Sequence, residues 1–121
     1  MSEQESLWFD LTVEDAVRVR DFYVATLGWT FDPMSMDAYD DFVMKAKGTA
    51  VAGICHARGP NEGFPPVWLP YFEVDSLKES LAICQAQGGT QVTEVRSTVP
   101  GMKYVVIRDP AGACAALFER V

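Results

Sequence analysis

The sequence predicts an α+β protein built from two tandem βαβββ modules whose curled mixed sheets surround a pocket, and three observations lead to this fold class. First, the chain aligns with itself, because Leu11 falls on Phe72 and Gly28 on Gly89, a constant offset of 61 residues in a chain of 121. Second, each half contains one segment with helical periodicity that ends at glycine. Third, the other segments are short, strand-like and bounded by turns. A repeat of this kind indicates one supersecondary unit used twice.

The length and composition favour a single domain over residues 1–121. With 49% apolar side chains, the chain has enough material for one core. A formal charge of −7, with Lys and Arg forming no stripe, argues against a nucleic-acid partner. No apolar run reaches the ~20 residues needed to cross a bilayer, and the first residues are acidic and polar. We therefore expect a cytoplasmic protein without a membrane partner.

The first module is expected over about residues 6–56. A first strand leads through the acidic turn Glu14-Asp15, which can cap a helix, and the helix ends at Gly28. Its apolar residues are expected on one face, namely Ala16, Val19, Phe22 and Tyr23. Three further strands are expected at roughly 29–31, 41–45 and 49–55.

The second module is expected over about residues 67–120, after a connector at 57–66 that is rich in Pro and Gly. Ser76 and Glu79 form an S-x-x-E capping box at the start of its helix. The helix carries apolar residues at Leu77, Leu81 and Cys84 and ends at Gly88-Gly89. Strands are expected at 90–96, 102–108 and 113–119, with a type I turn at 109–112. One module alone would bury too little surface, so we expect the two copies to share one sheet system, with or without a second subunit.

Several short motifs stand in the same order as in a known superfamily. They are Val13-Glu14-Asp15, Ala16, Phe22-Tyr23, Leu27-Gly28-Trp29 and Asp109-Pro110-Ala111-Gly112. Together they resemble the vicinal oxygen chelate superfamily of glyoxalases, bleomycin-resistance proteins and extradiol dioxygenases, over about residues 7–119. The resemblance implies paired βαβββ modules around a pocket, with homodimer contacts beside it.

In metal-using members of that superfamily, a His or Gln on the first strand and a Glu on the last strand of a module hold a divalent cation. Carried over by resemblance, these positions fall on Trp8, Ala52, Leu69 and Ala116. None of these side chains can bind a metal, and a lone donor such as Glu119 or His56 does not make a site. We therefore expect a member without the usual metal and without a cofactor.

Alternation along the two first strands predicts which side chains face the pocket. Trp8, Asp10 and Thr12 are expected there from the first module, and Leu69, Tyr71 and Glu73 from the second. Asp10 and Tyr71 occupy equivalent places and are the catalytic candidates, Asp10 as a general base. The alternatives are that Asp10 binds a cationic or hydroxylated ligand, or that it lies at the rim of the sheet, solvated or hydrogen-bonded to neighbouring backbone.

The other candidate residues are expected to bind a ligand. The full ligand-binding set is Trp8, Thr12, Tyr39, Leu69, Glu73 and Tyr104. Trp8, Tyr39, Tyr71 and Tyr104 either form an aromatic wall or pack in the core. An acidic loop at 32–41 either covers the pocket mouth or is a surface connection or dimer contact, and Glu73 can pair with Lys103 or Arg108.

The three cysteines favour reduced, buried thiols over a disulfide framework, because they are odd in number and widely spaced. Cys55 and His56 are adjacent in a predicted strand, so their side chains point to opposite faces and do not form a catalytic pair.

The function we expect is that of a metal-independent small-molecule binding protein with an apolar or aromatic ligand. The alternative is a lyase, isomerase or dioxygenase-like or hydroxylase-like enzyme. It would use Asp10 as base with Tyr71 or Tyr104 as acid, or a relocated divalent metal. A structural dimer without a ligand is a third interpretation. The fold alone does not decide among the three, because a fold of this kind supports many chemistries.

Overall fold

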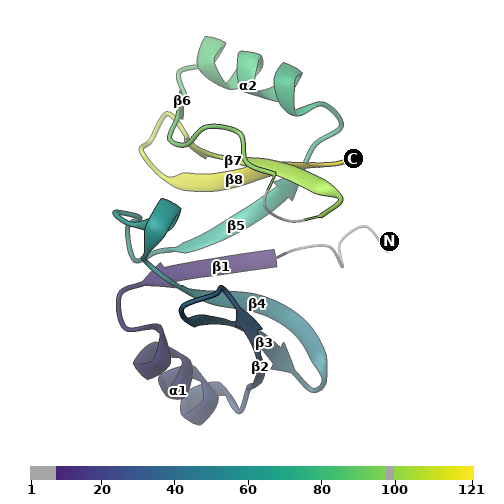
Figure 1. The fold of residues 1–121 in the computed structure, drawn as a ribbon. Helices are drawn as coiled ribbons and strands as arrows, with labels where there is room; N and C mark the ends of the chain where they lie inside the picture. Colours follow the sequence, from purple (N-terminus) through teal and green to yellow (C-terminus); the bar gives the residue numbers. More distant parts are fainter. Residues whose placement is uncertain (1–7, 98–99) are drawn as a thin grey trace. The chain divides into compact units, whose positions relative to one another are not determined.

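The computed structural model describes residues 8–97 and 100–121 and divides after Trp68 into two compact units (Figure 1). The elements of unit 1 are β1 (Trp8–Val13), α1 (Ala16–Leu27), β2 (Thr30–Ser35), β3 (Asp40–Ala46), β4 (Thr49–His56) and the short 3₁₀ helix η2 (Gly59–Asn61). Those of unit 2 are β5 (Trp68–Glu73), α2 (Leu77–Ala86), β6 (Thr90–Gln91), β7 (Met102–Arg108) and β8 (Cys114–Arg120), although Trp68, the first residue of β5, is still counted in unit 1. Each unit follows the order βαβββ, which confirms the predicted α+β class.

The two units have the same sheet topology. Unit 1 has the strand order β2-β3-β4-β1, and unit 2 has the order β5-β8-β7-β6. In each unit the first strand pairs in parallel with the last, β1 with β4 and β5 with β8, and the other pairings are antiparallel. The parallel pairing is possible because a long crossover, the helix and two strands, joins the first strand to the last.

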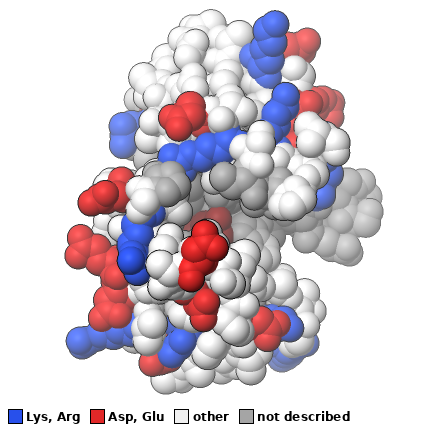
Figure 2. Space-filling view, in the orientation of Figure 1, with Lys and Arg blue, Asp and Glu red and all other residues white. Residues whose placement is uncertain are grey.

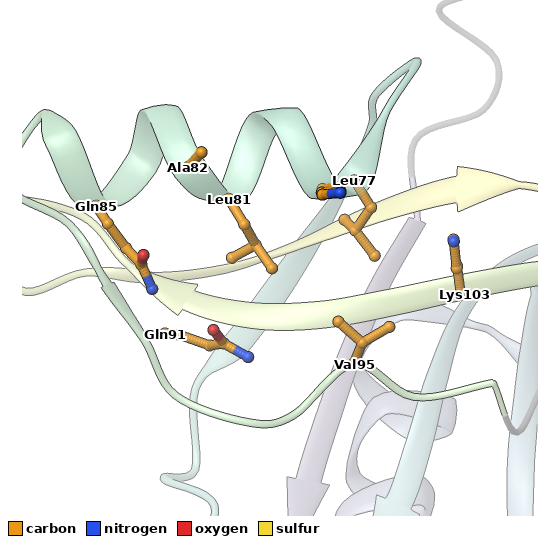
Figure 3. Close-up of a pocket in the computed structure, with 8 residues that line it drawn as sticks. Leu77, Leu81, Ala82, Gln85, Gln91, Val95 and Lys103 are labelled. Carbon is orange, nitrogen blue, oxygen red and sulfur yellow. The ribbon is translucent and has the colours of Figure 1, made fainter.

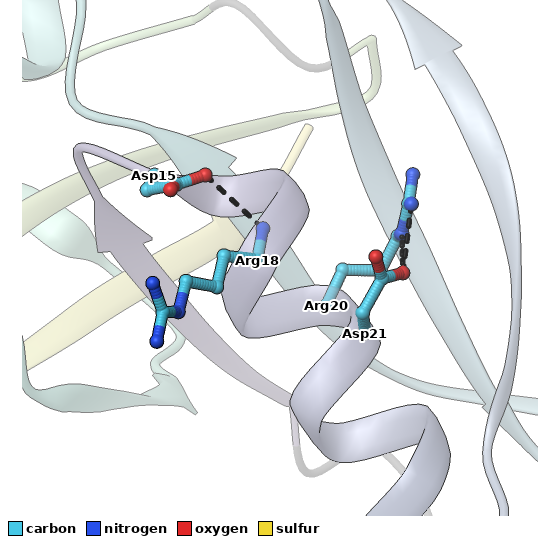
Figure 4. Close-up of polar contacts among 4 residues, drawn as sticks. All are labelled: Asp15, Arg18, Arg20 and Asp21. Atoms are coloured by element: carbon cyan, nitrogen blue, oxygen red, sulfur yellow. Dashed lines mark hydrogen bonds and ion pairs between the residues drawn. The ribbon is translucent and has the colours of Figure 1, made fainter.

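Helix α1 begins and ends where the sequence predicts. The Asp15 carboxylate accepts a hydrogen bond from the backbone N–H of Arg18 at 3.1 Å (Figure 4). Gly28, with φ of 75°, ends the helix in the left-handed conformation that favours glycine. Figure 4 also shows the exposed ion pair between neighbouring Arg20 and Asp21, 2.7 Å long. Both ends of the helix are therefore set by capping residues that are its neighbours in the sequence.

The core of unit 1 lies between α1 and one face of its sheet. It consists of Ala16, Phe42, Met44, Ala52 and Ile54, all nearly inaccessible to solvent. Val19 and Tyr23 of α1 pack against it, but Phe22 is 56% exposed, so its expected place on the buried face was wrong. Successive helical residues are 100° apart, so the residue before Tyr23 turns toward solvent.

The acidic segment 32–41 is not a loop, contrary to expectation. Strand β2 extends to Ser35 and pairs with β3, and only 36–39 form the turn, with the Met36 N–H donating to the Tyr39 carbonyl at 2.8 Å. Pro33 is tolerated because β2 is the last strand of the unit 1 sheet and proline cannot donate to a ladder. The segment is therefore a β-hairpin arm with a short turn.

Helix α2 of unit 2 has two polar contacts at its first turn. Ser76 Oγ accepts the Glu79 N–H at 3.2 Å, as the predicted cap requires, and Glu119 Oε1 accepts the Leu77 N–H at 2.7 Å. The predicted turn at 109–112 is also present, closed by the Gly112 N–H to the Asp109 carbonyl at 2.9 Å.

The strand expected at 90–96 is much shorter in the structure, where β6 ends at Gln91. Beyond it, the buried Thr93 side chain accepts the Val106 N–H through Oγ1 at 3.1 Å. A side chain thus takes the place of a backbone partner and interrupts the ladder. The backbone N–H groups of Val92 and Thr93 still donate to the Val106 carbonyl of β7, at 2.8 and 3.3 Å, and Arg96 forms an isolated bridge with Tyr104.

In the view of Figure 2, Lys and Arg side chains are interspersed with Asp and Glu side chains among uncharged residues. Among residues 8–97 and 100–121, neither helix is long and apolar enough to cross a membrane.

Candidate functional site

The sheet face of unit 1 that is turned away from α1 carries the predicted first-strand residues. Strands β1 and β4 pair with Asp10 opposite Gly53 and Thr12 opposite Cys55. Ala52 and Ile54 lie on the other face, in the core beneath the helix. Because side chains alternate along a strand, Trp8, Asp10 and Thr12 share the helix-free face with Gly53 and Cys55.

Trp8, Asp10 and Gly53 form the most closely packed part of this face. Trp8 Nε1 donates a hydrogen bond to Asp10 Oδ1 at 2.7 Å, partly shielded from solvent. A Cβ atom placed on Gly53 would overlap that oxygen and would lie 3.4 Å from Asp10 Cγ and 3.7 Å from Trp8 Cζ2. Only glycine at position 53 leaves room for the carboxylate, so these three residues are one structural unit.

A second carboxylate, that of Asp41 at the start of β3, lies beside Cys55 of the same sheet face. Asp41 is 2% exposed, and its Oδ1 accepts the backbone N–H of His56 at 2.9 Å and lies 3.3 Å from His56 Nδ1. Burial raises the pKa of the Cys55 thiol well above its ordinary value, and the carboxylates of Asp10 and Asp41 raise it further. The thiol is protonated at neutral pH and is therefore not an activated nucleophile.

Tyr39 does not stack on Trp8, the other predicted wall residue of unit 1, but belongs to a different group of side chains. Its ring centroid is 5.2 Å from that of His56, and the Arg58 guanidinium lies 4.3 Å above the tyrosine ring. A chain of side-chain contacts thus runs near the end of β4, from Asp41 to His56, from His56 to Tyr39 and from Tyr39 to Arg58. Sequence reasoning considered His56 only as a partner for Cys55 or as a lone metal donor, and it missed Asp41 and Gly53.

Unit 2 brings together two of the predicted aromatic residues. The Tyr71 and Tyr104 ring centroids are 5.7 Å apart, and Phe118 lies 6.5 Å from Tyr71. Glu73, on the same strand face as Tyr71, pairs with Arg120 at 2.9 Å. The expected partners Lys103 and Arg108 were therefore wrong. Arg120 belongs to β8, the strand that pairs in parallel with β5, and so lies within reach of Glu73.

One of the four metal positions inferred by resemblance was misplaced by one residue. Tyr71 lies opposite Ala116 in unit 2, whereas its equivalent Asp10 lies opposite Gly53 in unit 1, not Ala52. The cause is an irregularity in the β3–β4 pairing at Met44/Lys45, which shifts the register.

The corrected positions still lack metal-binding side chains. They are Trp8, Gly53, Leu69 and Ala116. Within the described part of the chain, no three His, Cys, Asp or Glu side chains are grouped closely enough to hold a metal ion. The residues present therefore do not fit the divalent cation of the metal-using members.

Comparisons with known proteins agree with this architecture. Residues 6–115 match the family model of the Glyoxalase/Bleomycin resistance protein/Dioxygenase superfamily. The chain is 29% identical over 113 residues to CFP32 of Mycobacterium bovis, a protein named as a candidate glyoxylase, covering 93% of this chain and 43% of that protein. It is 25% identical over 126 residues to the anthracycline biosynthesis protein DnrV of Streptomyces peucetius, covering 93% and 46%.

A solved structure of a superfamily member from Vibrio splendidus 12B01 shares the fold, with a TM-score of 0.64 at 13% identity, over 93% of this chain and 97% of that one. The chain spans less than half the length of the two curated relatives. The family model, which matches residues 6–115, shows that this chain belongs to the Glyoxalase/Bleomycin resistance protein/Dioxygenase superfamily.

Proposed function

We propose that this chain binds a small apolar or aromatic molecule without a metal ion, at the helix-free face of unit 1. The observation that carries this proposal is the packing of the Asp10 carboxylate against Gly53, held by the Trp8 indole at 2.7 Å. In metal-using relatives the equivalent positions supply donors to a cation. Here an indole replaces one donor, and the neighbouring carboxylate fills the space of the other.

The chemistry of this face suits a ligand with a flat apolar body and a hydroxyl group. The indole of Trp8 provides a large rigid surface, and Asp10 provides a charged hydrogen-bond acceptor beside it. One relative is named as an anthracycline biosynthesis protein. In unit 2, the rings of Tyr71 and Tyr104 form a separate aromatic surface.

The test is a titration with 2-naphthol, a flat aromatic alcohol, followed by the indole N–H resonances of Trp8, Trp29 and Trp68 in ¹⁵N NMR spectra. We expect a saturable shift at Trp8, while Trp29 and Trp68, which contact Tyr23 in unit 1, stay unchanged. Decahydro-2-naphthol, a saturated molecule of the same size, is expected to bind more weakly. Equal affinity for both alcohols would reject an aromatic ligand, and no shift at Trp8 would reject the site.

Asp10→Asn is expected to weaken 2-naphthol binding about tenfold, because a charged acceptor becomes neutral while the oxygen that accepts the Trp8 N–H remains. Asp37→Asn, the same change in the exposed turn after β2, is the matched control and should leave the affinity unchanged. Unchanged affinity in Asp10→Asn would exclude a binding role for Asp10. Proton exchange on a carbon acid that Asp10→Asn abolishes would instead favour the enzyme alternative.

A further inference from the structure

A groove of about 350 Å³ lies in unit 2 between α2 and the segment that follows β6 (Figure 3). It lies on the helix-covered side of the sheet, away from Tyr71 and Tyr104. Leu77 and Leu81 point from α2 toward the segment that carries Val95. Leu77 is 1% exposed, whereas Val95 is 43% exposed, so the groove has a buried floor and an open apolar wall. Its volume is at the lower end of the range for small-molecule sites.

The charged side chains that line this groove are both cationic, although the chain as a whole carries a formal charge of −7. They are Lys78 of α2 and Lys103 of β7, and Figure 3 shows Lys103 extending from the strand toward the helix. Neither lysine forms an ion pair with any residue of 8–97 or 100–121. Two unpaired ammonium groups beside an apolar floor are complementary to an anion with an apolar body.

A carboxylate of the protein itself belongs to the residue paired with Lys103. Glu119 is the β8 residue paired with Lys103 across the ladder. Its Oε1, however, accepts the Leu77 N–H at 2.7 Å at the first turn of α2. Glu119 is therefore engaged in capping the helix, and the two lysines remain available to a ligand.

We infer that this groove binds a small amphipathic carboxylate. The aliphatic or aromatic body lies over Leu77, Leu81 and Val95, and the carboxylate lies at Lys103 and Lys78. The amide groups of Gln85 and Gln91 line the groove as well and give a longer ligand polar contacts. This site is independent of the proposed function, because it lies in unit 2 and uses none of the residues around Trp8.

The probe is octanoate, with octanol and octylammonium as ligands of the same length and different charge. Binding is measured by calorimetry and by the backbone resonances of α2 and of the segment around Val95. We expect octanoate to bind saturably at millimolar concentration, octanol more weakly and octylammonium weakest. Equal affinity for octanoate and octanol would overturn the proposal. If the resonances shifted with protein concentration and not with octanoate concentration, the groove would be a contact between two copies of the chain. That result would also overturn the proposal.

Lys103→Gln is expected to weaken octanoate binding about tenfold, because a charge-assisted hydrogen bond is lost, while Lys103→Arg keeps the binding. Lys47→Gln, the same change in the exposed turn between β3 and β4, is the control and should have no effect. Ala82→Trp, at an exposed position that lines the groove, is expected to fill the groove and abolish binding without loss of helical circular dichroism. Octanoate binding that survives both Lys103→Gln and Ala82→Trp would contradict the site.

Discussion

Gly53→Ala is expected to lower the free energy of unfolding by about 1–3 kcal/mol, the usual range for an added methyl group in a packed site. The new Cβ would overlap Asp10 Oδ1, so the carboxylate must leave its position and lose the Trp8 hydrogen bond. By itself, alanine in a strand interior favours folding over glycine by roughly 0.5–1 kcal/mol. A measured loss of stability would therefore come from the overlap of the new Cβ with Asp10, and not from the change in backbone entropy. The measurement is urea denaturation followed by circular dichroism.

The control for this prediction is the same substitution in an Asp10→Ala background. Without the carboxylate the methyl group has space, and we expect Gly53→Ala to become neutral or to stabilise by up to about 1 kcal/mol. The difference between the two backgrounds is the coupling free energy of residues 10 and 53. If Gly53→Ala destabilised both backgrounds equally, the close packing of Asp10 against Gly53 would be contradicted.

Alkaline pH is expected to destabilise the protein through Cys55. Burial, and then the carboxylates of Asp10 and Asp41, hold the pKa of this thiol far above its ordinary value of 9.0. The thiol therefore has a lower pKa in the unfolded chain than in the folded chain. At pH values between these two, the unfolded chain has lost a proton that the folded chain keeps, so the free energy of unfolding falls as pH rises. One such proton gives a slope of up to about 1.4 kcal/mol per pH unit above pH ~9.

The measurement is denaturant unfolding at several pH values above 9, for the parent chain and for Cys55→Ala. In Cys55→Ala, the free energy of unfolding is expected to fall less steeply with pH, by the contribution of one proton. This difference in slope does not depend on the stability of the variant at neutral pH. In Asp10→Asn, one of the two nearby negative charges is removed, so the thiol of the folded chain ionises at a lower pH. The fall of the free energy of unfolding with pH should therefore level off at a lower pH than in the parent chain. Identical slopes for the parent and Cys55→Ala would contradict the buried, anion-flanked position of the thiol.

The fold was predictable because the signals of each module are local and occur twice. Asp15, Gly28 and Ser76 mark helix ends through hydrogen bonds with their own neighbours in sequence. Strand β2 was underestimated because Pro33 usually indicates a break, and only its position at the end of the unit 1 sheet allows it. β6 was overestimated because the Thr93 side chain, which favours strands by propensity, here replaces a ladder bond.

The candidate site was predictable only in part, for physical reasons that differ between residues. Alternation correctly placed Trp8, Asp10 and Thr12 on one face, because the period of a strand is two wherever the strand is regular. The position opposite Asp10 was missed because the register shift at Met44/Lys45 is set by pairing between strands and not by local sequence. A glycine inside a strand does indicate close approach of another group, and this signal could have identified Gly53.

The residues joined by long-range contacts were the hardest to predict. Asp41 and His56 are 15 positions apart in sequence and meet only because β3 and β4 are adjacent. The partner of Glu73 is Arg120, 47 positions away, and it was missed for the same reason. The contact of Tyr71 with Tyr104 was anticipated as part of a wall, and the structure brings these two rings together.

The most direct test of a metal-free site is thermal unfolding of the metal-stripped protein with and without Zn²⁺, Ni²⁺, Mn²⁺ and Fe²⁺. An ion at about 100 times its dissociation constant adds about 2.7 kcal/mol of stability, which raises the midpoint of a domain of this size by on the order of 10 °C. Because Trp8, Gly53, Leu69 and Ala116 offer no metal ligand, we predict that the midpoint stays unchanged with each ion. A saturable rise with any of them would contradict the account and indicate a metal centre built from other residues.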